Sequence, residues 1–546
     1  MKQNKPAYTV QKFNTIREMT ELARNESPDK IAYRYKDDSE QVISVTFRAF
    51  YDVTENLGAA LTDMGYGQAH VACISENSYS WITAYLTILK GAGVFVPIDK
   101  ELAAADKLHL LNDSESTVVF FSEKQESFLR ENKDKLPNIR CFIGFDLVQD
   151  DGDFLSYAQL IEKGKAMDKS AYDGLRSDEH ALKMLVYTSG TTGMAKGVML
   201  TEHNLVSSVY YGLQVSQVYD VGLSVLPYNH VYESVCDILV AHHLRSTLCI
   251  NRSMKDIVKD LKLYQPSYIY LVPALAEVLY ASITRNIKKQ KKEKTFARGV
   301  KISRFLLKLG IDLRPKLFKE LRDVFGGRIV KIVCGGAPIR PELGKFFDDI
   351  GIILTGGYGI TECSPLVSVN DEHCNDFHTA GSRLPCLEWR IDNPNTEGIG
   401  EICVKGDVVM KGYFKNPEKT AEVLKDGWFY TGDYGYITED DQIVLTGRKK
   451  NIIVLNSGKN IYPEEIELII KNIHYISEVV VRGLKNENGD EFSLLAEVYL
   501  EEEKSNEDVF QDIQNILKDQ PSYKNVTKVI IRTEPFVKTT TNKIKR

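Results

Sequence analysis

Short apolar runs alternate with helix-like stretches over the first two thirds of this 546-residue chain. Five of these runs are short, apolar and β-rich, as buried strands are: HVACISENS, STVVFFSE, LSVLPY, PSYIYLVP and GRIVKIVCGG. Helix-like stretches such as YDVTENLGAALTDMGYG and SVYYGLQVSQ lie close to them. Alternation of this kind predicts a doubly wound α/β architecture built on parallel sheets.

The sequence texture changes in the last third of the chain. From Gly381 to Leu445 short strands follow one another closely, separated by Gly and Asp turns, which predicts a small antiparallel β-barrel. From Gly447 on, segments such as EEIELIIKNIH and SEVVVRGL carry strand and helix signals of their own. We therefore expect an N-terminal domain over 1–446, made of stacked α/β subdomains plus the barrel. A small, mobile α+β domain over 447–546 follows it.

Charge and cysteine usage exclude several classes of protein. A net charge of −6, from 69 basic and 75 acidic residues, produces no overall field that favours nucleic acid. The nine cysteines are scattered without a C-x-x-C pair, which is typical of reduced thiols rather than of a zinc site. The N-terminus has no apolar signal region, and no apolar run reaches the roughly 18 to 20 residues of a membrane span. We expect a cytoplasmic, soluble protein.

One charge run stands out, between Arg285 and Lys308. It contains ten Lys or Arg against a single acidic residue, Glu293. The apolar spacing of FARGVKISRFLLKLGI predicts an amphipathic helix here. The plain interpretation is a solvated helix packed on the protein. The alternative is peripheral contact with the inner face of a membrane, because basic amphipathic helices are attracted to anionic headgroups.

The strongest local signal is MLVYTSGTTGMAKGVMLTEHN, where a strand-like run ends at Tyr187 and opens into small and hydroxyl residues. These residues are Thr188, Ser189, Gly190, Thr191, Thr192 and Gly193, followed by Lys196. Small residues let backbone amides surround an anion, hydroxyls add donors, and the lysine adds a positive charge. The loop suits a polyphosphate. It is not a Walker A loop, because Gly197 stands where that motif needs Ser or Thr.

Three further segments carry groups that a nucleotide needs. IVCGGAPI and LTGGYGITECSP place glycines at strand ends, where a flat base can approach the backbone. The second segment adds Tyr358, Thr361 and Glu362, residue types that stack a base, contact a phosphate and hold a divalent cation. WFYTGDYGYITEDDQIVLTGRKKN offers Asp433 and Arg448, a pair suited to ribose hydroxyls.

YTSGTTGMAKG, GGAP, YGITE, YTGD, GRKKN and the terminal KTTTNKIKR resemble, in order and spacing, the motif set of the AMP-forming acyl-CoA synthetase (adenylate-forming) superfamily. The resemblance covers essentially the whole chain, and the texture is most similar to bacterial long-chain fatty-acid–CoA ligases. It implies ATP-dependent activation of a carboxylic acid, here a medium- or long-chain fatty acid. Acyl-AMP and pyrophosphate form first, and coenzyme A then displaces AMP. ATP, Mg²⁺ and coenzyme A are the implied cofactor and co-substrates.

The resemblance also implies a role for individual residues. The loop from Thr188 to Lys196 would close over the β and γ phosphates, Glu362 would hold Mg²⁺, and Thr361 would contact the α-phosphate. The implied adenine pocket consists of Gly335, Gly336, Ala337, Tyr358 and Gly359, and the implied ribose ligands are Asp433 and Arg448. His230, in LPYNHVYE, would lie beside the acyl substrate. For His230 alone, a structural role is equally compatible with the sequence.

Lys543, near the chain end, matches the family's catalytic lysine, which bridges the carboxylate and the α-phosphate. It would supply positive charge where the pentacoordinate phosphorus accumulates negative charge. Without the resemblance, a solvated terminal side chain would be expected. Because Lys543 lies in the small domain and the nucleotide loops lie in the large one, the domains must close and later rearrange. Lys450 matches the hinge position.

Three positions depart from the family pattern. Asn542 stands where Gly usually precedes the lysine, Asn451 where Asp is more common, and Val537 where Pro is often found. Asn tolerates left-handed backbone better than other non-glycine residues, so we expect the turn to survive. The change at Asn451 leaves a hinge-region contact in question, and Val537 alters only loop stiffness.

Three alternatives remain open on the sequence. The first, an acyl-AMP ligase that loads an acyl carrier protein, is disfavoured because 445–463 lacks the long insertion associated with such relatives. The second, an aryl-acid–CoA ligase, shares every motif. The third, a non-catalytic acyl or nucleotide sensor, is disfavoured by the joint presence of Lys196, Glu362, Asp433, Arg448 and Lys543. The sequence does not reveal acyl chain length, although the Tyr-rich VYYGLQVSQVY is a candidate tunnel wall.

Overall fold

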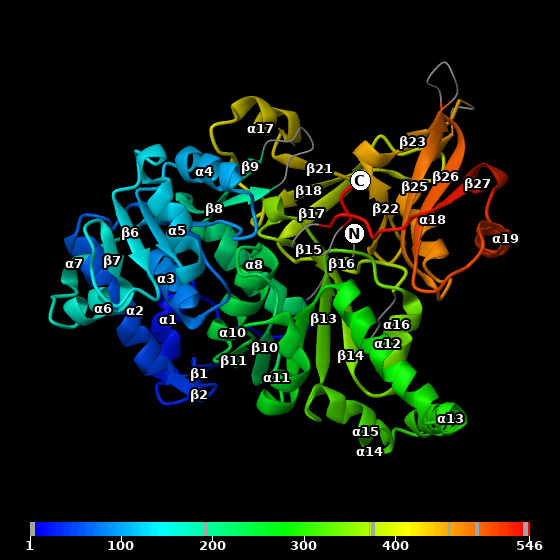
Figure 1. Cartoon of the computed structure of the whole chain (residues 1–546), viewed down its shortest axis with the longest axis horizontal. Coiled ribbons are helices and arrows are strands. Elements are labelled where there is room, and N and C mark those ends of the chain that lie inside the picture. Colours follow the sequence, from blue (N-terminus) through cyan, green and yellow to red (C-terminus); the bar gives the residue numbers. More distant parts are fainter. Residues whose placement is uncertain are drawn as a thin grey trace.

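The structure, a computed structural model, describes residues 6–188, 195–370, 372, 377–456, 459–485, 491–538 and 544–546. Figure 1 shows a broad body that contains most of the chain and a smaller unit formed by its last hundred residues. Within the described residues, three large sheets build the body, and a two-stranded and a three-stranded sheet build the smaller unit.

The first sheet lies in the N-terminal part of the body and has eight strands in the described residues. Its strands, in spatial order, are β19 (Gly412–Tyr413), β9 (Lys196–Thr201), β8 (Leu182–Thr188), β4 (Val94–Pro97), β3 (His70–Ile74), β5 (Val118–Phe121), β6 (Cys141–Gly144) and β7 (Phe154–Ser156). The runs HVACISENS and STVVFFSE form the central strands β3 and β5, which pair in parallel. β8 and β9 pair antiparallel, so they form a hairpin at one side of the sheet.

The second sheet has nine strands among the described residues. They are, in order, β16 (Ser382–Arg383), β15 (Leu366–Val369), β14 (Ile353–Gly359), β13 (Lys331–Gly335), β12 (Tyr268–Leu271), β10 (Val221–Ser224), β11 (Thr247–Ile250), β1 (Ile31–Lys36) and β2 (Val42–Thr46). The predicted strands β10, β12 and β13 lie at its centre and pair in parallel. Gly335 is the register partner of Gly357, so the carboxyl ends of β13 and β14 lie together. The predicted doubly wound α/β class is confirmed.

The third sheet is antiparallel, as the texture after Gly381 predicts. Its strands are β17 (Leu387–Asp392), β18 (Gly400–Gly406), β21 (Trp428–Ile437), β20 (Leu424–Lys425) and β22 (Ile443–Arg448). Both β20 and β22 pair with the long β21, so the pairing branches at one strand. In the described residues the unit is a five-stranded antiparallel sheet, which fits the small β-barrel expected from the texture.

Helices cover the sheets of the body (Figure 1). In chain order they are α1 (Ile16–Glu26), α2 (Phe47–Asp63), α3 (Tyr79–Lys90), α4 (Ala104–Asp113), α5 (Glu123–Glu131), α6 (Tyr157–Lys165), α7 (Ser170–Gly174), α8 (Glu202–Val215), α9 (Val231–Glu233), α10 (Val240–His243), α11 (Ile257–Tyr264), α12 (Pro273–Lys289), α13 (Glu293–Lys308), α14 (Arg314–Leu317), α15 (Lys319–Arg322), α16 (Pro341–Asp349) and α17 (Pro417–Val423). The two predicted helix-like stretches are α2 and α8. Thr46 begins α2 by accepting a hydrogen bond from the Ala49 amide, and Thr201 begins α8 with a capping box.

The smaller unit has a hydrophobic core of its own, which includes Ile466, Val481, Leu494 and Ile513. It is built from β23 (Ile453–Val454), β24 (Asn460–Ile461), α18 (Pro463–Ile470), β25 (Ile476–Lys485), β26 (Glu491–Leu500), α19 (Asn506–Leu517) and β27 (Val526–Ile531). We refer to residues 447–546 as the cap. Its core is separate from that of the body, where the last contributing residue is Ile443.

The cysteines and the helices of the described residues bear on two expectations from the sequence. The eight cysteines that the structure describes are free thiols, as their scattered positions predict. No helix in the described ranges combines the length and apolar character required to cross a bilayer.

Candidate active site

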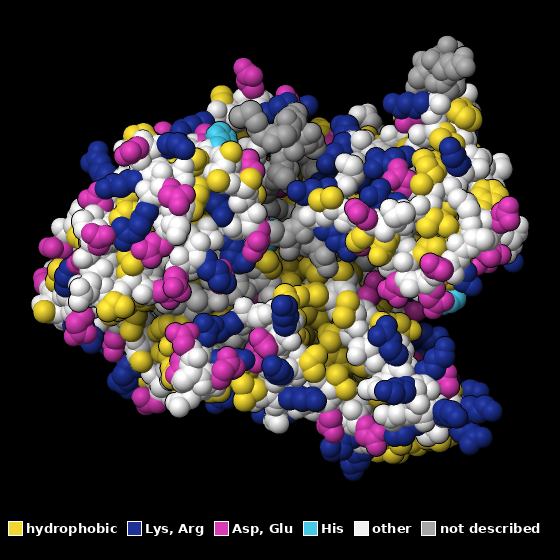
Figure 2. All heavy atoms as spheres, viewed as in Figure 1, with side chains coloured by type: hydrophobic (Ala, Val, Ile, Leu, Met, Phe, Trp, Pro, Cys, Tyr) yellow, Lys and Arg dark blue, Asp and Glu magenta, His cyan; other side chains and the backbone are white. Residues whose placement is uncertain are grey.

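A cavity of about 2970 Å³ lies between the body and the cap. Its walls come from the carboxyl ends of β13 and β14, from β21 and β22, and from α18 and the chain end. Figure 2 shows this face of the molecule hollowed between the two parts. Open α/β sheets bind ligands outside the carboxyl ends of their parallel strands, so this is the expected place for a site.

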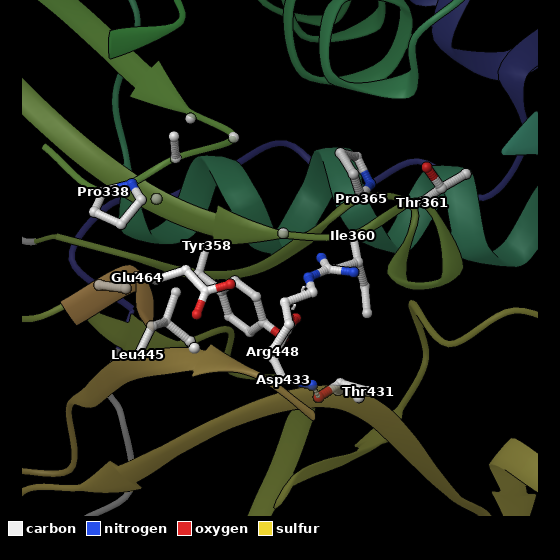
Figure 3. Close-up of a pocket in the computed structure, with 18 of the residues that line it drawn as sticks. Pro338, Tyr358, Ile360, Thr361, Pro365, Thr431, Asp433, Leu445, Arg448 and Glu464 are labelled. Atoms are coloured by element: carbon white, nitrogen blue, oxygen red, sulfur yellow. Dashed lines mark hydrogen bonds and ion pairs between the residues drawn. The ribbon is translucent and has the colours of Figure 1, made fainter. Parts of the chain in front are cut away.

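Tyr358, Asp433 and Arg448 form one hydrogen-bonded cluster in the cavity (Figure 3). The Tyr358 hydroxyl donates to Asp433 Oδ2 at 2.7 Å, and Arg448 Nε donates to Asp433 Oδ1 at 2.8 Å. Asp433 and Arg448 are register partners on β21 and β22, which explains why they meet. Burial, and the carboxylate beside it, raise the pKa of Tyr358 well above its ordinary value, so the phenol acts as a neutral donor. A buried carboxylate is thus held from two sides.

Glycines allow the backbone to pack closely beside this cluster. A Cβ at Gly359 would lie 2.4 Å from the Pro365 carbonyl oxygen, and one at Gly335 would lie 2.9 Å from the Tyr232 ring. Gly336 has a φ of +90°, a conformation that favours glycine. Gly336 and Ala337 are exposed where they line the cavity. A flat ring can therefore reach the backbone next to Tyr358.

A second cluster joins Glu362, Tyr413 and Lys196. Glu362 lies in the short helix η5 (Thr361–Cys363), and its Oε1 accepts a hydrogen bond from the Tyr413 hydroxyl at 2.8 Å. The Lys196 Nζ lies 5.1 Å from the centroid of the Tyr413 ring. The pairing of β19 with β9 brings Tyr413 to this position. One phenol ring thus contacts both a cation and a carboxylate in the same cavity.

The glycine-rich loop begins and ends beside this second cluster. Thr188 and Lys196 are register partners across the β8–β9 hairpin, and both line the cavity. Ser189, Gly190, Thr191, Thr192 and Gly193 lie outside the described residues. Thr361 also lines the cavity, next to Glu362.

His230 lines the cavity at the start of α9. Its carbonyl accepts hydrogen bonds from the amides of Glu233 and Ser234, so the residue also begins a helical turn. The loop before it is tied down by Asn77, whose side chain donates to the Leu226 carbonyl and accepts from the Tyr228 amide. His230 therefore has a structural place as well as access to the cavity.

Apolar residues from three segments line an extension of the cavity that we call the apolar arm. These residues are Gly212 and Leu213 of α8, Val231, Cys236 and Val240 of the following helical segment, and Leu366 and Val369 of β15. The Tyr-rich stretch is thus a wall, as the sequence suggested, but not through its tyrosines. Tyr210 and Tyr211 pack edge to face with ring centroids 5.1 Å apart and are absent from the lining.

Two acids behind the apolar arm were not identified from the sequence. Glu233 and Asp237 are fully buried, the second within a π-helical turn, η2 (Ser234–Leu239). Glu233 accepts from the Ser224 hydroxyl at 2.5 Å, and Asp237 accepts from the Tyr268 hydroxyl at 3.2 Å. Burial raises the pKa of both, that of Asp237 to about 7. Their spacing of four residues on a helix is the only sequence signal for the pair.

The cap contributes Lys450, Asn451 and Glu464 to the cavity. Asn451 Nδ2 donates to Glu464 Oε1 at 2.5 Å, which answers the question raised by the Asp-to-Asn departure. An Asp at position 451 would place two carboxylates together here. Glu464, on α18, projects towards Tyr358 in Figure 3 and was not identified from the sequence. Burial, with Arg448 and Arg546 nearby, lowers the pKa of Lys450.

The chain end returns to the same cavity. Lys538 and Ile544 form a β-bridge, and the Lys545 amide donates to the Val537 carbonyl at 2.8 Å. Arg546 forms ion pairs with Glu467 and with Glu464. Lys538 and residues 544–546 line the cavity. Lys543 and Asn542 lie outside the described residues, between these two placed segments.

Comparison with known proteins indicates the same family as the motifs. The family described as "AMP-binding enzyme" matches residues 20–414. The chain is 29% identical over 500 residues to long-chain-fatty-acid–CoA ligase FadD15 of Mycobacterium bovis, covering 87% of this chain and 81% of that protein. It is 30% identical over 490 residues to the chloroplastic long-chain-fatty-acid–[acyl-carrier-protein] ligase AEE15 of Arabidopsis thaliana, covering 76% and 67%.

A solved structure shares the fold. The fatty acyl CoA synthetase of Mycobacterium tuberculosis matches with a TM-score of 0.69 at 22% identity, over 97% of each chain. Because the family match extends over well more than half of the 546 residues, the resemblance drawn from the motifs is confirmed. This chain belongs to the AMP-binding enzyme family.

Proposed function

We propose that the protein activates a medium- or long-chain fatty acid with ATP and transfers the acyl group to the thiol of coenzyme A. The first half-reaction forms acyl-AMP and releases pyrophosphate, and the second releases AMP. The proposal depends mainly on one observation. The Tyr358–Asp433–Arg448 cluster, the Glu362–Tyr413–Lys196 cluster and the chain end all line one cavity.

The first cluster is the nucleoside site in this proposal. Adenine lies against Tyr358 and the glycines at the ends of β13 and β14, and the ribose hydroxyls bind Asp433 and Arg448. A carboxylate has about four acceptor positions, so Asp433 can accept from a ribose hydroxyl while it keeps its bond to Tyr358. Arg448 is nearly half exposed and is able to turn towards the ribose.

The second cluster is the phosphate site. Lys196 and the loop from Thr188 to Gly193 bind the β and γ phosphates, and Thr361 contacts the α-phosphate. Glu362 holds the Mg²⁺ that arrives with ATP. Mg²⁺ typically binds one or two carboxylates together with substrate phosphates, so a single glutamate fits. Tyr413 keeps that carboxylate in place through its hydrogen bond.

Lys543 supplies the charge that the first half-reaction needs. The difficulty of this step is to bring a carboxylate onto a polyanion, and a lysine that contacts both groups reduces it. The placement of Lys538 and Ile544 on the cavity wall supports this role. We assign residues 1–446 to the body and 447–546 to a mobile cap, with Lys450 at the hinge. The cap rearranges between the half-reactions.

The acyl chain occupies the apolar arm, and its carboxylate lies near His230. Each buried methylene contributes about 0.8 kcal/mol, so a long chain binds more tightly wherever the arm accommodates it. The hydrocarbon thus lies between α8, the helical segment 231–240 and β15, which together hold the apolar lining.

An acyl carrier protein is the second candidate acceptor, because one relative is named as a ligase for that carrier. We propose that the protein acts in the cytoplasm. Any peripheral membrane contact is assigned to 285–308, the basic stretch of the sequence.

A panel of fatty, aryl and short acids, each with ATP and either coenzyme A or holo acyl carrier protein, tests the function. We expect AMP release to be fastest with medium or long fatty acids and coenzyme A. AMP release confined to aryl acids would contradict the substrate class. AMP release only with holo acyl carrier protein would identify that carrier, and not coenzyme A, as the thiol acceptor.

A further inference from the structure

Exposed apolar side chains gather on one short stretch of the surface. Ile302, Phe305, Leu309, Ile311 and Leu317 are all large, apolar and more than 40% exposed. Three of them, Ile302, Phe305 and Leu309, are spaced by three and four residues on α13, so they share one face of that helix. An exposed apolar strip of this kind marks a surface that binds something.

α13 is held firmly but buries little of itself. Only Val300 and Ser303 of its 16 residues are buried. Phe296, on the inner face, contacts Phe318 and Phe346 with ring centroids 5.5 and 5.8 Å apart. The helix is therefore anchored by one edge and presents the opposite face outward.

The same helix and the end of α12 carry the basic run. Of its ten Lys and Arg, the described residues provide ion-pair partners for two, Lys292 with Glu320 and Arg304 with Asp349. The remaining eight have no ion pair within the described ranges: Arg285, Lys288, Lys289, Lys291, Lys294, Arg298, Lys301 and Lys308. Figure 2 shows Lys and Arg gathered at the lower right, where Figure 1 places α13.

We propose that the outer face of α13, with Ile311 and Leu317 beside it, docks on an anionic lipid bilayer. The charges complement anionic headgroups, and the apolar strip between them matches the acyl boundary below. Nucleic acid would satisfy the charges but leave Phe305 and Leu309 exposed to water. We call this face the lipid-docking surface.

α12 connects this surface with the cavity. Its first residues, Pro273 and Ala274, line the cavity, and its last residues belong to the basic run. A helix of 17 residues spans about 25 Å. The docked protein therefore holds its cavity a fixed, short distance from the bilayer. This proposal rests on the membrane contact proposed above for 285–308, names the docking face and its lipid, and is independent of the acid substrate.

Flotation of the full-length protein with lipid vesicles tests the surface. The vesicles are phosphatidylcholine alone or phosphatidylcholine containing phosphatidylglycerol. We expect binding to the anionic vesicles that is about tenfold stronger and weakens as salt is raised. The combined variant Lys294→Glu, Arg298→Glu, Lys301→Glu should lower that binding about tenfold. The variant Ile302→Ser, Phe305→Ser, Leu309→Ser should lower it with the charges unchanged.

A matched control lies on α11 and the turn just before it, which also expose lysines and apolar residues. Lys255→Glu with Lys262→Glu, and Leu263→Ser, should leave vesicle binding unchanged. Equal binding of the wild type and both α13 variants would overturn the proposal, as would capture by an acidic protein in place of vesicles. The flotation assay contains no substrate, so its failure is separate from failure of the ligase assignment. AMP release from a short soluble acid should be the same in every variant.

Discussion

Among single residues, Tyr358 shows how one hydroxyl prepares a binding group. Its hydroxyl donates to a carboxylate that is 5% exposed and that also pairs with Arg448. The phenol remains neutral because burial raises its pKa. A donor that cannot ionise at physiological pH is suited to hold Asp433 ready for a ribose.

Tyr358→Phe removes that donor and keeps the ring. Leaving a buried acceptor without a donor costs about 1 to 3 kcal/mol, so we expect a lower midpoint of thermal unfolding. The KM for ATP should rise about tenfold, which corresponds to about 1.4 kcal/mol of binding. Pyrophosphate exchange at varied ATP measures this. Tyr210→Phe, on the outer side of α8, is the control, and equal effects of the two changes would contradict the role of Tyr358.

The buried acids predict a pH dependence of stability. Burial raises the pKa of Asp237 to about 7, so the folded protein holds a proton there that the unfolded chain releases near pH 4. The folded state thus binds more protons, and stability decreases as pH rises through this window. Asp237→Asn removes the titration. As pH rises from about 4 to about 7, the unfolding midpoint of the wild type should therefore fall relative to that of Asp237→Asn. The control is the exposed Asp519→Asn, and parallel curves for wild type and Asp237→Asn would contradict the shift.

Among the elements, α8 shows that a helix can line a cavity through its smallest residue. A Cβ at Gly212 would lie 3.3 Å from Leu366 Cδ2, which is close but leaves the flexible leucine room to adjust. A larger side chain has no such room and must enter the apolar arm. The arm therefore depends on a glycine in a helix that is otherwise mostly buried.

Gly212→Leu should change which acids are used. It fills the arm beside Leu366, so the kcat/KM for a long-chain acid should fall at least tenfold more than that for an acid about eight carbons shorter. Rates of AMP release with the two acids give the ratio of their kcat/KM values. Gly174→Leu, where an added Cβ meets nothing within 4 Å, is the matched control. An unchanged ratio in Gly212→Leu would show that the chain lies elsewhere.

On the scale of the whole molecule, the cap is joined to the body around one cavity. Lys449 of the cap forms an ion pair with Glu401 of β18 in the body at 2.6 Å. The chain end is fastened to the cap itself through Arg546 and Glu467. In the proposed mechanism, the cap carries Lys543 with it when it rearranges about Lys450.

Lys543→Ala separates the two half-reactions. In the proposed mechanism the lysine acts only in adenylation, so pyrophosphate exchange should fall below detection. Thioester formation from supplied acyl-AMP should stay close to the wild-type rate. Lys545→Ala, two residues away on the same segment, is the control. Exchange at a near wild-type rate in Lys543→Ala would remove the lysine from the mechanism.

Much of the architecture could be predicted from local signals. The spacing of apolar runs predicts β3, β5, β10, β12 and β13 because buried parallel strands have a recognisable composition. The texture after Gly381 predicts the antiparallel strands of the third sheet, but their order is decided by contacts that periodicity does not encode. Tyr358, Asp433 and Glu362, which the motifs singled out, all line one cavity.

The sequence by itself determined the α/β class, the family and the residue types that meet at the carboxyl ends of the strands, since these follow from local spacing and motif order. Only the tertiary structure decided that Tyr413 links Lys196 with Glu362 and that Glu464 reaches into the cavity from the cap. It also decided that α8 lines the apolar arm with Gly212 rather than with tyrosines. The physical reason is that such contacts join segments far apart in the chain. The direction of each side chain is set by how those segments pack.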